Sequence, residues 1–197
     1  MIEFKERGIL IFSKISSENN LYLKILTQKD EIITGLSFGG STKKKKNIFQ
    51  LGYFLNIVIK NKNKNFPNSI SAELSKPYYH NIFNDKYKLH ALLTLVSLLN
   101  ISIIEGQKVS GLFNLCENII EILANEKKWI INYFIFMLNL LKIIGYDIDY
   151  QKNTSKDYLN LDSLQFSNIS ISNSLKFPHL LLNYKNNINL ENANSFF

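Results

Sequence analysis

Few side chains in this sequence combine the type and the spacing that catalysis requires. The three histidines, His80, His90 and His179, do not have the spacing of a metal site. The single cysteine, Cys116, lies in an apolar helical pattern, which is typical of a buried thiol rather than a nucleophile. We therefore expect no enzyme activity, no metal and no cofactor.

Binding chemistry is better represented, in the segment Thr34–Lys46. It is read as the end of a strand, followed by Gly39 and Gly40 and then by the four consecutive lysines Lys43–Lys46. The glycines allow a sharp turn, and four adjacent ammonium groups repel one another unless an anion gathers them. The pattern is compatible with a phosphate-binding loop and also with a solvated surface loop.

Further basic residues accompany this segment in the first third of the chain. Lysines bind phosphates as point charges, and aromatic rings stack on bases, so the combination predicts sequence-tolerant, salt-sensitive binding of nucleic acid. Phe38, Phe49, Tyr53 and Phe54 are interleaved with the basic residues, although each could instead belong to the core. The predicted nucleic-acid-binding residues are Arg7, Lys14, Lys24, Lys43, Lys44, Lys45, Lys46, Lys60, Lys62 and Lys64.

The charge is unevenly distributed along the 197 residues. The whole chain has 23 basic and 16 acidic residues, a formal net charge of +7. Residues 1–76 contain 13 basic and 6 acidic residues, whereas residues 77–197 contain 10 of each. The entire excess therefore lies in the first third, which favours a basic module that meets polyanions, joined to a neutral module.

The sequence gives two indications of cellular location. One cysteine cannot form an internal disulfide, and charged residues from Glu3 to Arg7 precede any apolar run, unlike a signal peptide. The apolar run Trp129–Ile144 is shorter than the roughly 20 residues of a membrane span. We expect a cytoplasmic, nucleoid-associated protein without a membrane partner; a membrane-associated adaptor that uses residues 126–144 is the weaker alternative.

The apolar pattern alternates in the first part of the chain and becomes helical in the second. Five short strands are predicted at 8–16, 21–27, 31–38, 51–60 and 69–76, with no helix between them. This indicates a five-stranded β-barrel of the OB type, with an SH3-like barrel as the alternative. The predicted fold class is α+β, with an OB-fold domain over residues 1–77 and an all-α helical domain over residues 78–197.

Three helices are predicted in the second part, at about 86–100, 107–124 and 126–144. Asn84 and Asp85 can cap the first of them, and Gly145 stands where the third should end. Beyond Tyr150 the sequence is polar and is expected to be partly irregular. Leu180–Leu182, after Pro178, is a plausible short last helix.

The order of several short motifs resembles the RecO family of recombination mediators. In the N-terminal part these motifs are Glu6-Arg7-Gly8-Ile9-Leu10, Leu26-Thr27, Thr34-Gly35, Gly39-Gly40, Gln50-Leu51-Gly52 and Ala72-Glu73-Leu74. In the helical part they are Leu138-Leu140-Leu141, Ile144-Gly145-Tyr146-Asp147-Ile148-Asp149 and Phe177-Pro178. The resemblance extends to about residue 182.

The resemblance implies an OB-fold joined to a helical domain, and a role in DNA repair. It implies binding of single- and double-stranded DNA, annealing of complementary strands and help in loading RecA on DNA coated by the single-stranded DNA-binding protein. The implied partners are RecR and the C-terminal tail of that protein, with RecA indirectly. It assigns DNA binding to Arg7 and to the basic loop after Gly40, whereas Lys14, Lys24, Lys60, Lys62 and Lys64 are inferred from charge alone.

This chain departs from the family in three respects. Many members have a four-cysteine zinc site, which a chain with one cysteine cannot form. Members are usually longer, and their DNA-binding arginines are mostly lysines here. An RNA-binding OB-fold protein of translation or RNA handling is the alternative function, and preference for DNA or RNA would discriminate the two.

Overall fold

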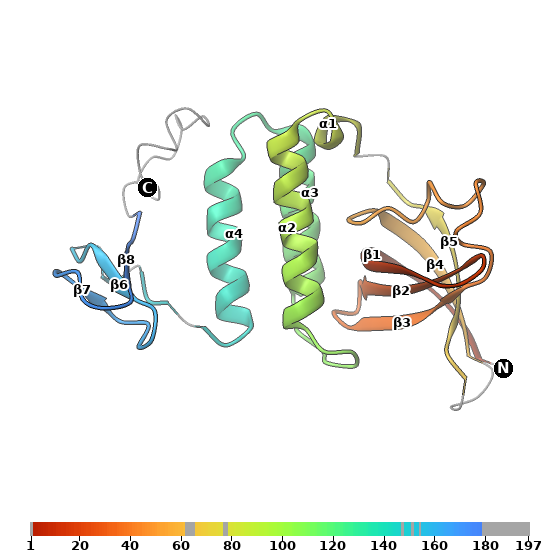
Figure 1. The fold of residues 1–197 in the computed structure, drawn as a ribbon, viewed down its shortest axis with the longest axis horizontal. Coiled ribbons are helices and arrows are strands. Elements are labelled where there is room, and N and C mark those ends of the chain that lie inside the picture. Colours follow the sequence, from red (N-terminus) through yellow and green to blue (C-terminus); the bar gives the residue numbers. More distant parts are fainter. Residues whose placement is uncertain are drawn as a thin grey trace. The chain divides into compact units, whose positions relative to one another are not determined.

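The computed structural model describes residues 2–61, 66–76, 79–146, 148–150, 152–153 and 155–178; of Ile2 and Tyr79 it describes only the backbone. Five strands, β1 (Ile2–Ser17), β2 (Asn20–Thr27), β3 (Ile32–Ser37), β4 (Phe54–Asn61) and β5 (Ser69–Leu74), close into a barrel in the order β1-β2-β3-β5-β4 (Figure 1). Strand β1 pairs with both β2 and β4, and irregularities between Leu10 and Phe12 and between Ile15 and Ser17 bend it. The barrel and the helices that follow confirm the predicted α+β class with an OB-type barrel.

The barrel is filled by the inward-facing residues of its strands. Alternate residues of β2, for example Leu23 and Ile25, point inward and are fully buried, as the period of two requires. Gly35 of β3 has no room for a side chain, because a Cβ there would lie 2.6 Å from the Asn68 carbonyl oxygen. That close approach joins β3 to β5 through the bond from Leu36 N to Asn68 O at 2.8 Å.

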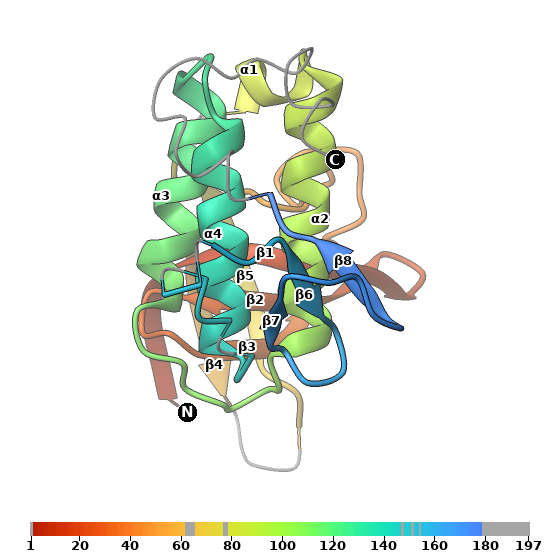
Figure 2. The ribbon, with the colours of Figure 1, turned by 90° about the vertical axis from the view of Figure 1, so that its left-hand side faces the viewer.

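Three helices follow the barrel: α1 (Tyr79–Phe83), α2 (Lys86–Ser102) and α3 (Leu112–Asn125). Helices α2 and α3 run alongside each other, connected by a loop at one end (Figures 1 and 2). Asp85 caps α2 as predicted, because its carboxylate accepts bonds from the backbone N–H groups of Tyr87 and Lys88.

The predicted start of the second long helix, at residue 107, is wrong. Gly106 and Gly111 have φ of +77° and +80°, so the chain turns before α3 begins at Leu112. The cap comes from the barrel: the Asp30 carboxylate accepts bonds from Gly111 N and Phe113 N, each at 2.8 Å. A side chain between β2 and β3 thus satisfies the first N–H groups of α3 and fixes the helix to the barrel.

The chain divides into two compact units, Met1–Asn125 and Glu126–Phe197, which we describe separately. The second unit contains α4 (Ile130–Ile143) and a small sheet of β6 (Tyr158–Asn160), β7 (Phe166–Ser167) and β8 (Ser174–Lys176), in the order β7-β6-β8. Its core includes Leu138, Leu159, Phe166 and Phe177. The sheet replaces the irregular segment expected there, and the division into domains at residue 77 stays a prediction.

Helix α4 ends as its sequence predicts. Gly145 has a φ of +103°, and the bonds from Gly145 N to Lys142 O and from Tyr146 N to Leu141 O form a Schellman motif. At 14 residues α4 is about 21 Å long, and none of the helices in the described part of the chain is long and apolar enough to cross a membrane. The helix expected at 180–182 lies outside the described residues.

Candidate nucleic-acid interface

The outer face of β1, β2 and β3 carries a compact set of basic and aromatic side chains. Strand register places them in two rows across the three strands, Phe12–Lys24–Thr34 and Lys14–Tyr22–Leu36. None of these six side chains is buried, whereas Ile9, Leu26 and Ile32 at the other end of the same strands are. We call the six residues the basic-aromatic face.

Aromatic contacts order the side chains of the basic-aromatic face. The ammonium group of Lys24 lies 5.6 Å from the ring centroid of Phe12, within cation–π range. The rings of Phe12 and Tyr22 meet edge to face, with centroids 6.3 Å apart. The face therefore combines partly exposed rings for stacking with cations for phosphates, as binding of a single strand requires.

The lysine loop, Phe38–Gln50, leaves β3 and is bonded to the tip of the β1–β2 hairpin. Gly39 N donates to the Asn20 side-chain oxygen and Ser41 N donates to the Asn19 carbonyl oxygen, each at 3.1 Å. Farther along, the Thr42 carbonyl oxygen accepts bonds from Lys45 N and Lys46 N. All four lysine side chains are exposed, but they extend from a backbone that these bonds hold in a series of turns.

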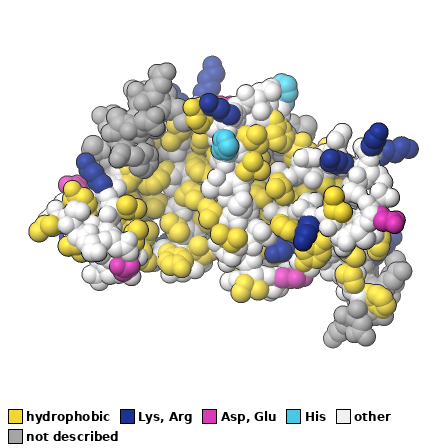
Figure 3. Space-filling model, in the orientation of Figure 1, with side chains coloured by type: hydrophobic (Ala, Val, Ile, Leu, Met, Phe, Trp, Pro, Cys, Tyr) yellow, Lys and Arg dark blue, Asp and Glu magenta, His cyan; other side chains and the backbone are white. Residues whose placement is uncertain are grey.

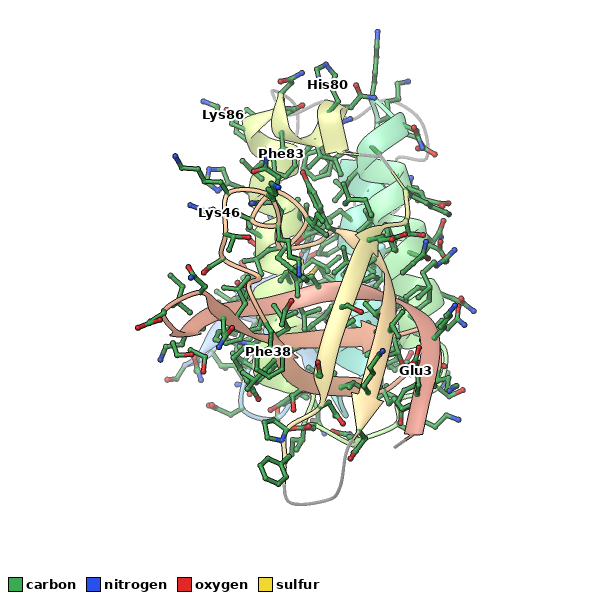
Figure 4. The ribbon with its side chains drawn as sticks, turned by 90° about the vertical axis from the view of Figure 1, so that its right-hand side faces the viewer. Glu3, Phe38, Lys46, His80, Phe83 and Lys86 are labelled. Carbon is green, nitrogen blue, oxygen red and sulfur yellow. The ribbon has the colours of Figure 1, made fainter. Side chains whose placement is uncertain are left out.

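The four lysines do not share one direction. Lys45 turns its ammonium group back to the Phe38 carbonyl oxygen, at 3.3 Å. Lys46 lines a pocket of about 330 Å³ together with Ser13 and Ser41. Figure 4 shows Phe38 and Lys46 on one side of the barrel and Glu3 on the other. Lys and Arg side chains also project among hydrophobic ones over the barrel (Figure 3).

The other predicted basic residues lie elsewhere. Lys60 forms a 3.1 Å ion pair with Glu3, so it belongs to the side of the barrel away from Lys46. Lys62 and Lys64 lie outside the described residues.

Arg7 is held within the first unit by an ion pair. Its guanidinium group donates to the Glu117 carboxylate of α3, and Lys76 contacts the same carboxylate at 2.9 Å. The guanidinium carbon lies 5.2 Å from the ring centroid of Phe113 and 5.9 Å from that of Phe54. These contacts tie the barrel to α3, and a role of Arg7 on DNA stays a prediction.

The predicted aromatic residues divide between core and surface. Phe49 and Phe54 are buried in the core, while 58% of Phe38 is exposed. Tyr53 is half-buried against Phe83, with ring centroids 5.9 Å apart. Sequence reasoning missed Phe12 and Tyr22; each stands two residues before a predicted lysine, and the strand period of two was the signal that could have found them.

The groups capable of other chemistry are not assembled in the described residues. No three His, Cys, Asp or Glu side chains there gather in a way that could hold a metal ion. Cys116 is fully buried in α3, and burial raises the pKa of its thiol far above the ordinary value, so the nucleophilic thiolate is suppressed.

Comparisons with known proteins agree with this architecture. The family described as Recombination protein O C terminal matches residues 84–156. The chain is 26% identical to the DNA repair protein RecO of Rickettsia canadensis over 77% of its own length, which covers 62% of that protein. It is 26% identical to RecO of Rickettsia bellii and 24% identical to RecO of Wolbachia pipientis, over 96% and 99% of its length and 83% and 85% of theirs.

The motifs that led to the expected resemblance include three glycines whose surroundings exclude a side chain, Gly8, Gly35 and Gly52. The barrel, the helices and the matches over nearly the whole length point to the same family. The chain is similar to the RecO proteins.

Proposed function

We propose that this protein acts in DNA repair and recombination by binding DNA on the basic-aromatic face and the lysine loop. The observation that carries the proposal is the strand register, which brings Lys14 and Lys24 next to Phe12 and Tyr22. The lysine loop is bonded to the hairpin formed by the same strands. Cations next to partly exposed rings suit a nucleic-acid strand, in which phosphates and bases alternate.

The specific activities that we propose are binding of single- and double-stranded DNA, annealing of complementary strands and assistance to RecA loading. A surface that neutralises phosphates lowers the repulsion between two complementary strands, which is what annealing requires. The proposed partners are RecR and the C-terminal tail of the single-stranded DNA-binding protein, with RecA acting indirectly. Support for these partners is the resemblance to RecO proteins alone.

The test measures binding and annealing with the same protein preparation. Fluorescence anisotropy compares single-stranded DNA, duplex DNA and RNA of one sequence at fixed salt. Strand annealing is followed by energy transfer between complementary oligonucleotides, with and without the single-stranded DNA-binding protein. DNA binding at least as tight as RNA binding, with faster annealing, supports the proposal. Tighter RNA binding without annealing supports RNA handling instead.

A matched pair of variants tests the location. Lys24→Ala removes a cation of the basic-aromatic face, and Lys60→Ala removes one from the other side of the barrel. Both substitutions lower the net charge by one. An effect that depends only on net charge would therefore weaken DNA binding equally in the two variants. We expect Lys24→Ala to weaken DNA binding severalfold more than Lys60→Ala does. Equal effects would contradict the proposed location.

A further inference from the structure

A pocket of about 330 Å³ opens between the β1–β2 hairpin and the lysine loop. Its apolar residues include Leu21 and Phe49, both nearly buried, with Ile15 among the lining residues and largely exposed. The other lining side chains include two hydroxyls, Ser13 and Ser41, an amide and the ammonium group of Lys46. A mainly apolar cavity with a few polar groups is the common form of a small-ligand site.

The backbone around the pocket is fixed by hydrogen bonds that hold its two walls together. Ser41 N donates to the Asn19 carbonyl oxygen at 3.1 Å, which joins the loop wall to the hairpin wall. Within the loop wall, the Gln50 side-chain amide donates to the Lys46 carbonyl oxygen at 3.0 Å. The cavity is therefore shaped before any ligand arrives, so little ordering cost remains for binding.

The charge of the lysine loop indicates which kind of ligand the pocket favours. Lys46 is the charged residue among those that line the pocket, and Lys43 and Lys44 are exposed three and two residues before it on the same loop. An anionic ligand with a flat apolar part fits the excess of positive charge and the apolar wall. A nucleotide has both properties: the base can lie against Phe49, and Lys46 can contact its phosphate.

We infer that this pocket holds one unstacked base of a single strand bound to the lysine loop, with Lys46 on the adjoining phosphate. The inference rests on the proposed function and adds a site that distinguishes single strands from duplexes. Bases of a duplex are paired and stacked, so entering the pocket would require their extrusion at an energetic cost. The hydroxyls of Ser13 and Ser41 and the Gln50 amide are the groups that could bond to the edge of the base.

The test crosses two proteins with two oligonucleotides. Ser41→Leu fills the pocket from the loop wall without changing the charge. One oligonucleotide carries bases, and the other is an abasic strand of the same length, which keeps only the phosphates and sugars. We expect Ser41→Leu to lose roughly fivefold or more in affinity for the strand with bases, as for loss of one stacked base. Its affinity for the abasic strand should remain within twofold of wild type.

Controls separate the pocket from charge and from folding. Lys44→Ala removes an exposed charge on the same loop, and it should lower the affinity for both oligonucleotides by the same factor. Ser13→Leu fills the pocket from the hairpin wall, and each filled variant is used only if its urea midpoint equals that of wild type.

Three results would overturn the inference. If Ser41→Leu and Ser13→Leu lose affinity equally for both oligonucleotides, the pocket contacts the sugar-phosphate backbone rather than a base. Unchanged affinities for both oligonucleotides would mean that no base of the bound strand enters the pocket. If wild type binds neither oligonucleotide, the proposed function fails and this inference fails with it, whereas the first two results leave the proposed function standing.

Discussion

Replacing Gly52 by alanine should destabilise the first unit through two separable effects. Gly52 has a φ of +81°, which costs an L-residue about 1–2 kcal/mol. A Cβ at this position would also lie 2.8 Å from both terminal carbons of Leu92 in the buried face of α2. Overpacking of this kind costs about 1–3 kcal/mol. Gly52→Ala should therefore lower the free energy of unfolding by about 2–5 kcal/mol.

Gly111 provides the matched control. Its φ of +80° is almost the same, but a Cβ there would meet nothing within 4 Å. Gly111→Ala should therefore cost only the backbone contribution, about 1–2 kcal/mol. The difference between the two variants isolates the contact of the segment before β4 with α2.

Urea unfolding followed by far-ultraviolet circular dichroism measures this difference. The single tryptophan, Trp129, lies in the second unit, so its fluorescence follows that unit separately. With a slope of about 2 kcal/mol per molar, an extra cost of about 2 kcal/mol moves the midpoint down by about 1 M relative to Gly111→Ala. Equal midpoints for the two variants would refute the packing of Gly52 against Leu92.

Three more predictions concern single side chains. Glu117→Gln should destabilise the protein by about 1–3 kcal/mol, because Arg7 and Lys76 lose their shared carboxylate; an unchanged urea midpoint would contradict this. Cys116 should resist a thiol reagent at pH 8 in the native protein and react on unfolding; rapid native reaction would disprove its burial. Burial raises the pKa of Tyr133 to about 12 from 10.0, so its contribution to stability is complete below pH 10 and is lost as the pH rises towards 12. Absorbance at alkaline pH should show a late-titrating phenol that disappears in Tyr133→Phe, and its persistence would assign it to another tyrosine.

Local patterns were sufficient to predict the barrel, because each strand buries one face. The alternation in 21–27 corresponds to β2 almost residue for residue, since Leu21, Leu23 and Ile25 must all point into the barrel. The end of α4 at Gly145 was equally local, because the Schellman motif forms within a few residues.

Elements that depend on distant partners could not be predicted in this way. The start of α3 is set by Asp30, 81 residues before Gly111 in the chain. The pairing of Arg7 with Glu117 spans 110 residues, so the sequence alone gave no reason to separate Arg7 from the exposed lysines. Strands β6–β8 have only two or three residues each, too few for a period of two to be recognised.

The same distinction applies to the candidate interface. Charge and the glycine turn indicated the lysine loop, but its bonds to Asn19 and Asn20 depend on the folded hairpin. Lys60 was grouped with the other lysines by charge, and only the barrel separates it from them.

The salt dependence of single-stranded DNA binding tests the central claim most directly. A variant with Lys43, Lys44, Lys45 and Lys46 changed to alanine is compared with one that loses four exposed lysines elsewhere, at positions 108, 127, 152 and 176. Each phosphate contact contributes about 0.7 to the slope of log affinity against log salt.

If three or four loop lysines contact phosphates, the slope of the loop variant should flatten by about 2–3 relative to wild type, and the control should keep the wild-type slope. Equal slopes for the loop variant and wild type, or an equal change in the control, would contradict DNA binding by the lysine loop.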